Sequence, residues 1–119
     1  TEIVLLAMTG NYIDHSYAAI VNLFRNHKQG IKIKIITSNS VIFPITEKIS
    51  LTYLKGRRFS LFPISPVKNF SLTGAQYNFS KDNLTITDYS ISNVIVDNKL
   101  MINFEKGKLF CVLFDVGFQ

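Results

Sequence analysis

One short segment near the start of the sequence combines residue types that serve phosphate and metal chemistry. It contains Thr9 and Gly10, followed by Asp14 and His15. Residues 2–8 predict a buried strand, and a glycine after such a strand lets a ligand approach the backbone at the edge of an open α/β sheet. A carboxylate there can hold Mg²⁺ or orient an attacking hydroxyl. The alternative is that Gly10 only turns the chain and that Asp14 caps the following helix.

A strand, a helix and a second strand are expected to position this segment. Residues 2–8 and 31–37 predict the strands, and the helix is expected from Asp14 to about His27, with Gly30 as its stop. One apolar stripe at helical spacing supports the helix and consists of Tyr17, Ile20, Val21 and Phe24. Because a strand of such a unit needs neighbours in a sheet, we expect residues 1–38 to be the C-terminal remnant of an α/β domain.

From residue 39 onward the helical periodicity disappears and short strands alternate with turns. The strands are predicted at 41–44, 48–54, 58–63, 69–73, 84–87, 91–96, 99–105 and 108–114. Lys81-Asp82-Asn83 is expected to be a turn, and Asp97-Asn98 a two-residue hairpin turn. Strands and turns at this spacing indicate an antiparallel sandwich over residues 39–119. The fold class expected for the chain is therefore mixed, an antiparallel β-sandwich preceded by a strand–helix remnant of an α/β domain.

The composition limits the kinds of protein that the chain can be. Of 119 residues, 47% are hydrophobic and 18% are charged, which is enough apolar material for a core. No apolar run approaches the roughly 20 residues of a membrane span, and residues 1–8 lack the pattern of a signal peptide. Cys111 is the only cysteine, so it is expected to be a small buried hydrophobe, and a reducing, cytoplasmic location is expected.

Several common chemistries lack their motifs in this sequence. It contains no G-x-x-x-x-G-K-[ST] loop, no G-x-G-x-x-G and no H-E-x-x-H, and its two histidines exclude a three-histidine metal site within one chain. The net charge of +5 favours anionic ligands, including nucleic acid, unless the basic residues lie on solvated strand faces. The basic residues form two clusters, Lys28, Lys32 and Lys34, and Lys55, Arg57 and Arg58. Solvated faces are the favoured interpretation, because Lys32 and Lys34 alternate with isoleucines.

Four segments, taken together and in this order, resemble the C-terminal part of thiamine pyrophosphokinases. The first is Thr9-Gly10-Asn11-Tyr12-Ile13-Asp14-His15. The resemblance implies that Thr9, Gly10, Asp14 and His15 bind the nucleotide, and that Asp14 also binds Mg²⁺ and is catalytic. Tyr12 stands where the family usually has an arginine, and Ala19 where an asparagine often occurs.

The other three segments resemble the family's β-sandwich, where thiamine binds between two subunits. They are Phe59-Ser60-Leu61-Phe62-Pro63, Leu72-Thr73-Gly74-Ala75-Gln76-Tyr77 and Ser90-Ile91-Ser92-Asn93. The resemblance implies that Tyr77, Ser92 and Asn93 bind thiamine, with an aromatic ring for stacking and polar groups for hydrogen bonds. The alternative for these residues is structural, with Tyr77 in the core and Ser92 and Asn93 at a strand edge. Val94 replaces a glutamate of the family.

The resemblance therefore implies a thiamine pyrophosphokinase, which transfers pyrophosphate from ATP to thiamine and gives thiamine diphosphate and AMP. It implies Mg²⁺ as cofactor, ATP as co-substrate and a homodimer, with neither nucleic acid nor membrane as partner. The acidic motif of the family's first half does not occur in this sequence, so the chain by itself is expected to be inactive. The alternatives are a non-catalytic ligand-binding β-sandwich of that family and, from the charge alone, a basic β-domain that binds nucleic acid.

Overall fold

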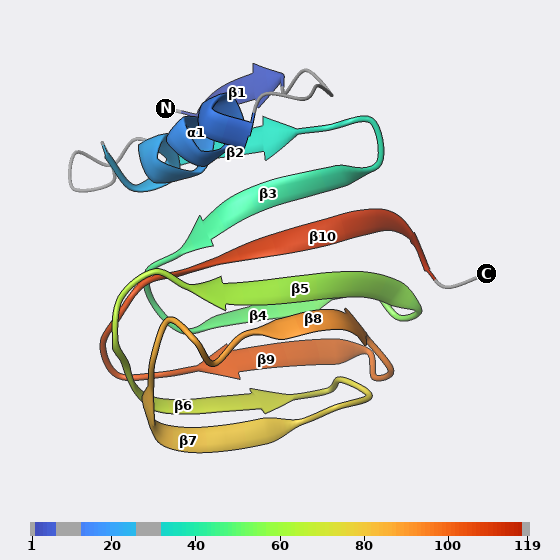
Figure 1. Ribbon diagram of the computed structural model, residues 1–119. Helices are drawn as coiled ribbons and strands as arrows, with labels where there is room; N and C mark the ends of the chain where they lie inside the picture. Colours follow the sequence, from blue (N-terminus) through green and yellow to red (C-terminus); the bar gives the residue numbers. More distant parts are fainter. Residues whose placement is uncertain (1, 7–12, 26–31, 118–119) are drawn as a thin grey trace.

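The computed structural model describes residues 2–6, 13–25 and 32–117, which form two β-sheets and one helix (Figure 1). The elements in chain order are β1 (Glu2–Leu6), α1 (Ile13–Arg25), β2 (Lys32–Ile36), β3 (Ser40–Ile45), β4 (Ile49–Thr52), β5 (Arg57–Pro63), β6 (Val67–Thr73), β7 (Phe79–Leu84), β8 (Ser90–Val94), β9 (Lys99–Asn103) and β10 (Leu109–Gly117). One sheet has the strand order β1-β2-β3-β10-β5-β8, and the other has the order β4-β9-β6-β7.

The two sheets pack face to face as a sandwich, because one face of each strand is apolar. Phe59 and Leu61 of β5, Leu72 of β6 and Ile102 of β9 are buried between the sheets. From β3 onward, the strand pairings of the described residues are antiparallel, and the chain passes repeatedly from one sheet to the other. The predicted fold class is thereby confirmed.

The N-terminal strand–helix unit is part of the larger sheet. β1 pairs parallel with β2, and β2 pairs antiparallel with β3, so one sheet continues across residues 37–41. α1 has its own small core, in which Leu23 packs with Ile33 and Ile35 of β2. The connecting turn is closed by the Thr37 hydroxyl, which accepts a hydrogen bond from the backbone N–H of Ser40 at 2.9 Å. The division into domains at residues 38 and 39 stays a prediction.

Only part of the apolar stripe that the sequence predicts for the helix is buried. Ile20 and Phe24 pack against the core of the helix, but the fully buried residue is Leu23, whereas Tyr17 is 71% exposed and Val21 is also exposed. Among the described elements, the helix packs mainly against β2 and β3, and its buried residue Leu23 faces them. Its end is observed at Arg25, and Gly30, the predicted stop, lies outside the described residues.

The prediction of a strand at residues 84–87 is wrong, because β7 occupies Phe79–Leu84 and residues 85–88 form a turn. The Asp88 carboxylate accepts hydrogen bonds from the Thr85 backbone N–H at 2.8 Å and from the Thr85 hydroxyl at 3.0 Å. The hydrogen bond from the backbone N–H of Thr85 is the main reason that the pKa of Asp88 lies below its usual value. The ammonium of Lys81 and the hydroxyl of Thr85 lower this pKa further. Residues 81–83, expected as a turn, are exposed positions of this edge strand, where charged side chains discourage pairing with other chains.

Asp97 and Asn98 form no hairpin between β8 and β9, since these strands belong to different sheets. The segment carries the chain across the sandwich. Ile95 donates its backbone N–H to the carbonyl of Arg57 at 2.9 Å, and Val96 donates to the carbonyl of Gly74 at 2.9 Å. A local turn pattern specifies the reversal but leaves open which sheet the next strand joins.

Two residues of the second basic cluster, Arg57 and Arg58, make contacts within the fold. Arg57 donates from Nε to the carbonyl of Phe114 at 2.7 Å and forms an ion pair with Asp115 at 3.6 Å. The guanidinium of Arg58 lies 4.1 Å from the centre of the Phe114 ring. Within the described part of the chain, no helix has the length and apolar character needed to cross a membrane. The cytoplasmic location stays a prediction.

Cys111 lies fully buried on β10, as the sequence predicts, and burial raises the pKa of its thiol far above the usual range. The thiolate, which is the reactive form, is therefore absent at pH 8. We expect an aromatic disulfide reagent at pH 8 to react with the native chain at least about 100-fold more slowly than with the chain in guanidinium chloride. Rapid reaction of the native chain, compared with glutathione as reference thiol, would contradict the burial.

Candidate functional site

The end of β6 and the strand β8 meet at a turn that begins at Gly74. Gly74 has a φ of 89°, and a Cβ at this position would lie 2.2 Å from the carbonyl oxygen of Lys99, so the turn requires glycine. Gln76 donates its backbone N–H to the carbonyl of Val94 at 2.8 Å, and Ala75 donates to Oδ1 of Asn78 at 2.9 Å. The turn is thereby fixed against β8.

Asn93 is the polar residue at the centre of this junction, and it is only 1% exposed. Its Oδ1 accepts hydrogen bonds from the backbone N–H of Tyr77 at 3.1 Å and from that of Val94 at 2.9 Å. Its Nδ2 donates to the carbonyl of Tyr77 at 2.9 Å and to the hydroxyl of Ser90 at 3.2 Å. These four bonds use the hydrogen-bonding capacity of an amide, so Asn93 holds the backbone of Tyr77 in place.

Ser92 lies on a β-bulge in β8. In the pairing with β5, Phe59 is opposite Asn93 and Leu61 is opposite Ser90, so β8 contains one extra residue between these pairs. Ser92 takes up the extra length with a φ of 55°. Its backbone N–H donates to the buried hydroxyl of Ser60 at 3.0 Å, while its own half-buried hydroxyl makes no hydrogen bond to another described residue. Bulges often re-aim a side chain at a site, and the Ser92 hydroxyl is free to bind.

Apolar side chains are exposed around this bulge. Tyr77 is 65% exposed, and Tyr89 and Ile91 are more than half exposed. The ring of Tyr89 lies 5.8 Å from that of Phe62, which stacks at 5.0 Å on Phe110. From the sequence we do not predict Tyr89 or Ile91 as site residues. Their positions directly before and after Ser90, in a segment that resembles the family's, are the signal that could have indicated them. The surface near the bulge therefore exposes two tyrosine rings, whose faces can stack on an aromatic or cationic group.

Asp14 and His15, two other predicted site residues, belong to a different part of the molecule. Thr9 and Gly10 lie outside the described residues, whereas Asp14 and His15 are exposed on the first turn of α1. α1 packs beside β2 and β3, and β8 is the opposite edge of the same sheet (Figure 1). Within one chain, the structure therefore does not bring Asp14 and His15 together with Tyr77, Ser92 and Asn93.

Asp14 on its own does not provide a complete binding site for Mg²⁺. Among the described residues, no group of three histidine, cysteine, aspartate or glutamate side chains is placed to hold a metal ion. Mg²⁺ normally retains an octahedral shell of oxygen ligands, of which one carboxylate supplies only a part. The described residues do not fit the ion without further ligands.

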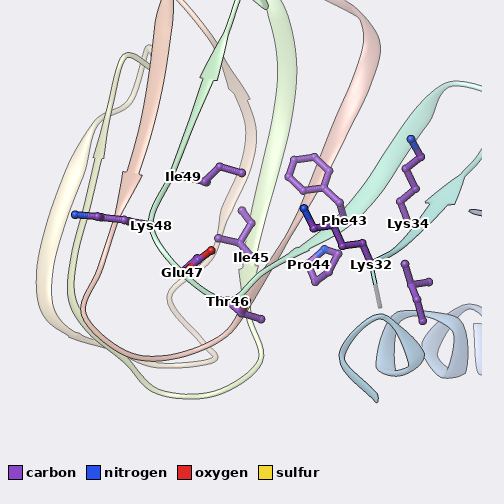
Figure 2. Close-up of a pocket in the computed structure, with 10 residues that line it drawn as sticks. Lys32, Lys34, Phe43, Pro44, Ile45, Thr46, Glu47, Lys48 and Ile49 are labelled. Atoms are coloured by element: carbon purple, nitrogen blue, oxygen red, sulfur yellow. The ribbon is translucent and has the colours of Figure 1, made fainter. Parts of the chain in front are cut away.

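A cavity of about 260 Å³ lies beneath β3, away from all of these residues (Figure 2). Its lining comes from β2, from residues 43–48 and from the first residue of β4, Ile49. The lining thus joins β2 and β3 of the larger sheet to β4, an edge strand of the smaller sheet. Figure 2 shows Lys34 and Lys48 directed away from each other, so these two lysines do not converge on one ligand position.

Comparison with known proteins identifies a matching domain family. Residues 45–109, more than half of the chain, match the family model described as thiamin pyrophosphokinase, vitamin B1 binding domain. This match covers Tyr77, Ser92 and Asn93 together with the turn and the bulge that position them. A comparison with curated protein sequences found no significant match.

Solved structures with the same fold include thiamin pyrophosphokinases from bacteria and yeast. The enzyme from Bacillus subtilis has a TM-score of 0.81 and 24% identity, and the match covers 93% of this chain and 54% of that one. The enzyme from Geobacillus thermodenitrificans has a TM-score of 0.78 and 23% identity, with coverages of 96% and 54%. The enzyme from Candida albicans has a TM-score of 0.77 and 16% identity, with coverages of 96% and 44%. The chain thus spans about half the length of these relatives.

Replacing Asn93 by alanine should loosen the turn at Tyr77. It would leave the N–H and carbonyl of Tyr77 without their side-chain partner in a part-buried position, and we expect a loss of about 2–4 kcal/mol in the free energy of unfolding. Asn78→Ala is the matched control, because it removes a single bond to the same turn and should cost about 1 kcal/mol. Urea unfolding measures both variants. Equal losses would show that Asn93 has no special role.

Proposed function

The chain belongs to the thiamin pyrophosphokinase family through its vitamin B1 binding domain, and on this basis we propose that it binds thiamine beside the β8 bulge. The observation that carries the proposal is the buried amide of Asn93, which fixes the backbone of the exposed Tyr77 next to Ser92. Thiamine has two aromatic rings, one of them cationic. A tyrosine ring provides a stacking face for such a ligand, and a free hydroxyl provides a hydrogen bond.

The three residues have different roles in this proposal. Tyr77 stacks on the vitamin, and Ser92 presents its hydroxyl from the bulge that Ser60 holds. Asn93 is a positioning residue, because its amide is already fully hydrogen-bonded within the fold. Recognition by a pre-formed backbone loses less conformational entropy on binding than recognition by a mobile turn.

We further propose that the functional unit is a homodimer with the thiamine site at its interface. The exposed apolar residues Tyr89 and Ile91 beside the bulge support a contact there with a second copy. The position of Asp14 at the other side of the six-stranded sheet supports the same arrangement. A site that uses both ends of the sheet is completed by two chains.

For the full-length protein we propose the transfer of pyrophosphate from ATP to the hydroxyl of thiamine, which gives thiamine diphosphate and AMP. Thr9, Gly10, Asp14 and His15 would contact the nucleotide, and Asp14 would be the one carboxylate that this chain contributes to a Mg²⁺ site. The protein's task in such a reaction is to place the thiamine hydroxyl in line with the phosphate that it attacks. The chain of 119 residues is expected to bind thiamine without turnover.

A non-catalytic thiamine-binding domain is the second candidate function. Asp14 is the only acidic residue of α1, and Ala19 on the same helix packs into the apolar core, where the family often has an asparagine. Measuring AMP formation by the full-length protein with ATP, Mg²⁺ and thiamine separates the two functions. Turnover that Asp14→Asn abolishes supports the enzyme, and saturable thiamine binding with no turnover supports the second candidate.

Replacing Tyr77 by alanine should weaken thiamine binding about tenfold, because the stacking face is lost. Calorimetric titration of the chain with thiamine measures the effect. Tyr77→Phe keeps the ring and should bind within about twofold of the unmodified chain. Tyr53→Ala is the control, since Tyr53 is 94% exposed in another turn. An equal loss in Tyr53→Ala, or none in Tyr77→Ala, would contradict the assignment.

Replacing Ile91 by lysine should separate the dimer, because a charge at the centre of an interface loses its water. Sedimentation should show monomers, and thiamine binding should fall with the dimer population. Ile86→Lys is the matched control, because Ile86 is exposed to a similar extent in the turn before β8. A variant that is monomeric but binds thiamine as tightly as the unmodified chain would show that the thiamine site does not lie at the dimer interface.

A further inference from the structure

A second cavity, of about 540 Å³, opens at the end of the sandwich where two chain connections meet. These are the β5–β6 and β9–β10 connections, which Figure 1 shows at the end opposite to the β6–β7 turn that contains Tyr77. The lining residues are Ser65, Pro66, Val67, Lys68, Asn83, Lys106, Gly107 and Lys108. The cavity therefore has three lysines and no acidic or aromatic residue, and it lies apart from the proposed thiamine site.

Strand pairing brings these lysines together from distant parts of the sequence. Lys68 of β6 is opposite Asn83 of β7, and on its other side it forms an antiparallel bridge with Lys106. Directly opposite residues of an antiparallel pair project from the same face. The backbone N–H of Lys68 donates to the carbonyl of Lys106 at 2.7 Å, which fixes this alignment. Two ammonium groups and an amide thus form one row, with Lys108 beside it.

The positive charge of this row is not neutralised by the described part of the chain. None of Lys68, Lys106 and Lys108 forms an ion pair with another described residue. The neighbouring acidic residues, Asp82 and Glu105, do not line the cavity. Like charges directly opposite one another in a sheet are destabilising. A bound anion would remove that repulsion.

The backbone that carries the lysines is held rigidly. Gly107 has a φ of 133°, and a Cβ there would lie 2.6 Å from the carbonyl oxygen of Pro66. Lys108 donates its N–H to the hydroxyl of Ser65 at 2.9 Å and accepts at its carbonyl from Ile64 at 2.9 Å. The two connections are therefore locked together, and a ligand would meet lysines whose backbone positions are already fixed.

We propose that this cavity binds a multivalent phosphate anion, namely a diphosphate or triphosphate group. Lysine ammonium groups bind phosphate as point charges, and the amide of Asn83 offers a further donor. The volume is within the range of small-molecule sites. Because no aromatic side chain lines the cavity, recognition is directed at the phosphates and provides no stacking face for a base.

The test is a titration of the ¹⁵N-labelled chain with inorganic pyrophosphate at low ionic strength, followed by the amide resonances of Val67, Lys68 and residues 106–108. Lys68→Gln/Lys106→Gln should weaken binding about tenfold or more, since two charge contacts are lost. Lys55→Gln/Lys99→Gln is the matched control, because it has the same net charge with both lysines exposed outside the cavity, and it should bind within about twofold.

A second readout is the thermal midpoint in phosphate-free buffer of low ionic strength. The cavity variant should be more stable than the unmodified chain by a few degrees, because the repulsion between Lys68 and Lys106 is removed. Pyrophosphate should then raise the midpoint of the unmodified chain and leave that of the cavity variant unchanged. No gain in the variant and no stabilisation by pyrophosphate would overturn the proposal.

The outcomes also separate the sources of the phosphate group. ATP that shifts the same amides as pyrophosphate identifies a nucleotide triphosphate as ligand, and shifts with pyrophosphate alone identifies the free anion. If pyrophosphate binding is weakened equally in the cavity variant and in the control variant, the anion is attracted by the overall charge and the proposed site is wrong. Much tighter binding of an oligonucleotide, with a steep salt dependence, would replace it by a nucleic-acid surface. Because Tyr77→Ala leaves the cavity intact, failure of thiamine binding and failure of pyrophosphate binding are independent results.

Discussion

The buried amide of Asn93 is the interaction on which the junction between β8 and the turn after β6 depends. An amide removed from water destabilises the fold unless each of its groups finds a partner. Asn93 meets this requirement through four bonds, which reach the turn after β6 and two neighbours within β8. A slip of β8 by one residue would break the two bonds to the backbone of Tyr77 and turn the apolar residues of β8 to the other face. The amide therefore fixes the register that exposes Tyr77 and Ser92.

The unequal width of the two sheets determines what can gather around this junction. β8 closes one edge of the larger sheet and β1 lies at the other, while the smaller sheet covers only the part between them. α1 packs beside β2 and β3, so β10 and β5 lie between the strands beside α1 and β8. A reaction that needs residues of both α1 and β8 would require a second copy of the chain, which is the reason for the dimer that we propose.

The sequence predicts the strands of the core well, because alternating apolar residues are visible without knowledge of the partners. It fails at β7, where Phe79 and Leu84 are the only apolar residues and polar side chains occupy the positions between them. It also fails at Asp97-Asn98, because a turn pattern does not say which sheet the next strand joins. The proximity of Tyr77 to Ser92 and Asn93 is consistent with the motif resemblance. The positioning role of Asn93 depends on burial, which only the fold reveals.

The sequence alone also does not show where positive charge gathers in the folded chain. Residues 55–58 form a basic cluster in the sequence, yet Arg57 and Arg58 are engaged with the carbonyl and ring of Phe114. Lys68 and Lys106 are 38 positions apart in the numbering, yet a bridge places them side by side. Since a phosphate responds to the field at one point in space, the residues that attract it are selected by strand pairing. In this fold the pairing of β6 with the segment after β9 creates the concentrated positive charge that no run of the sequence displays.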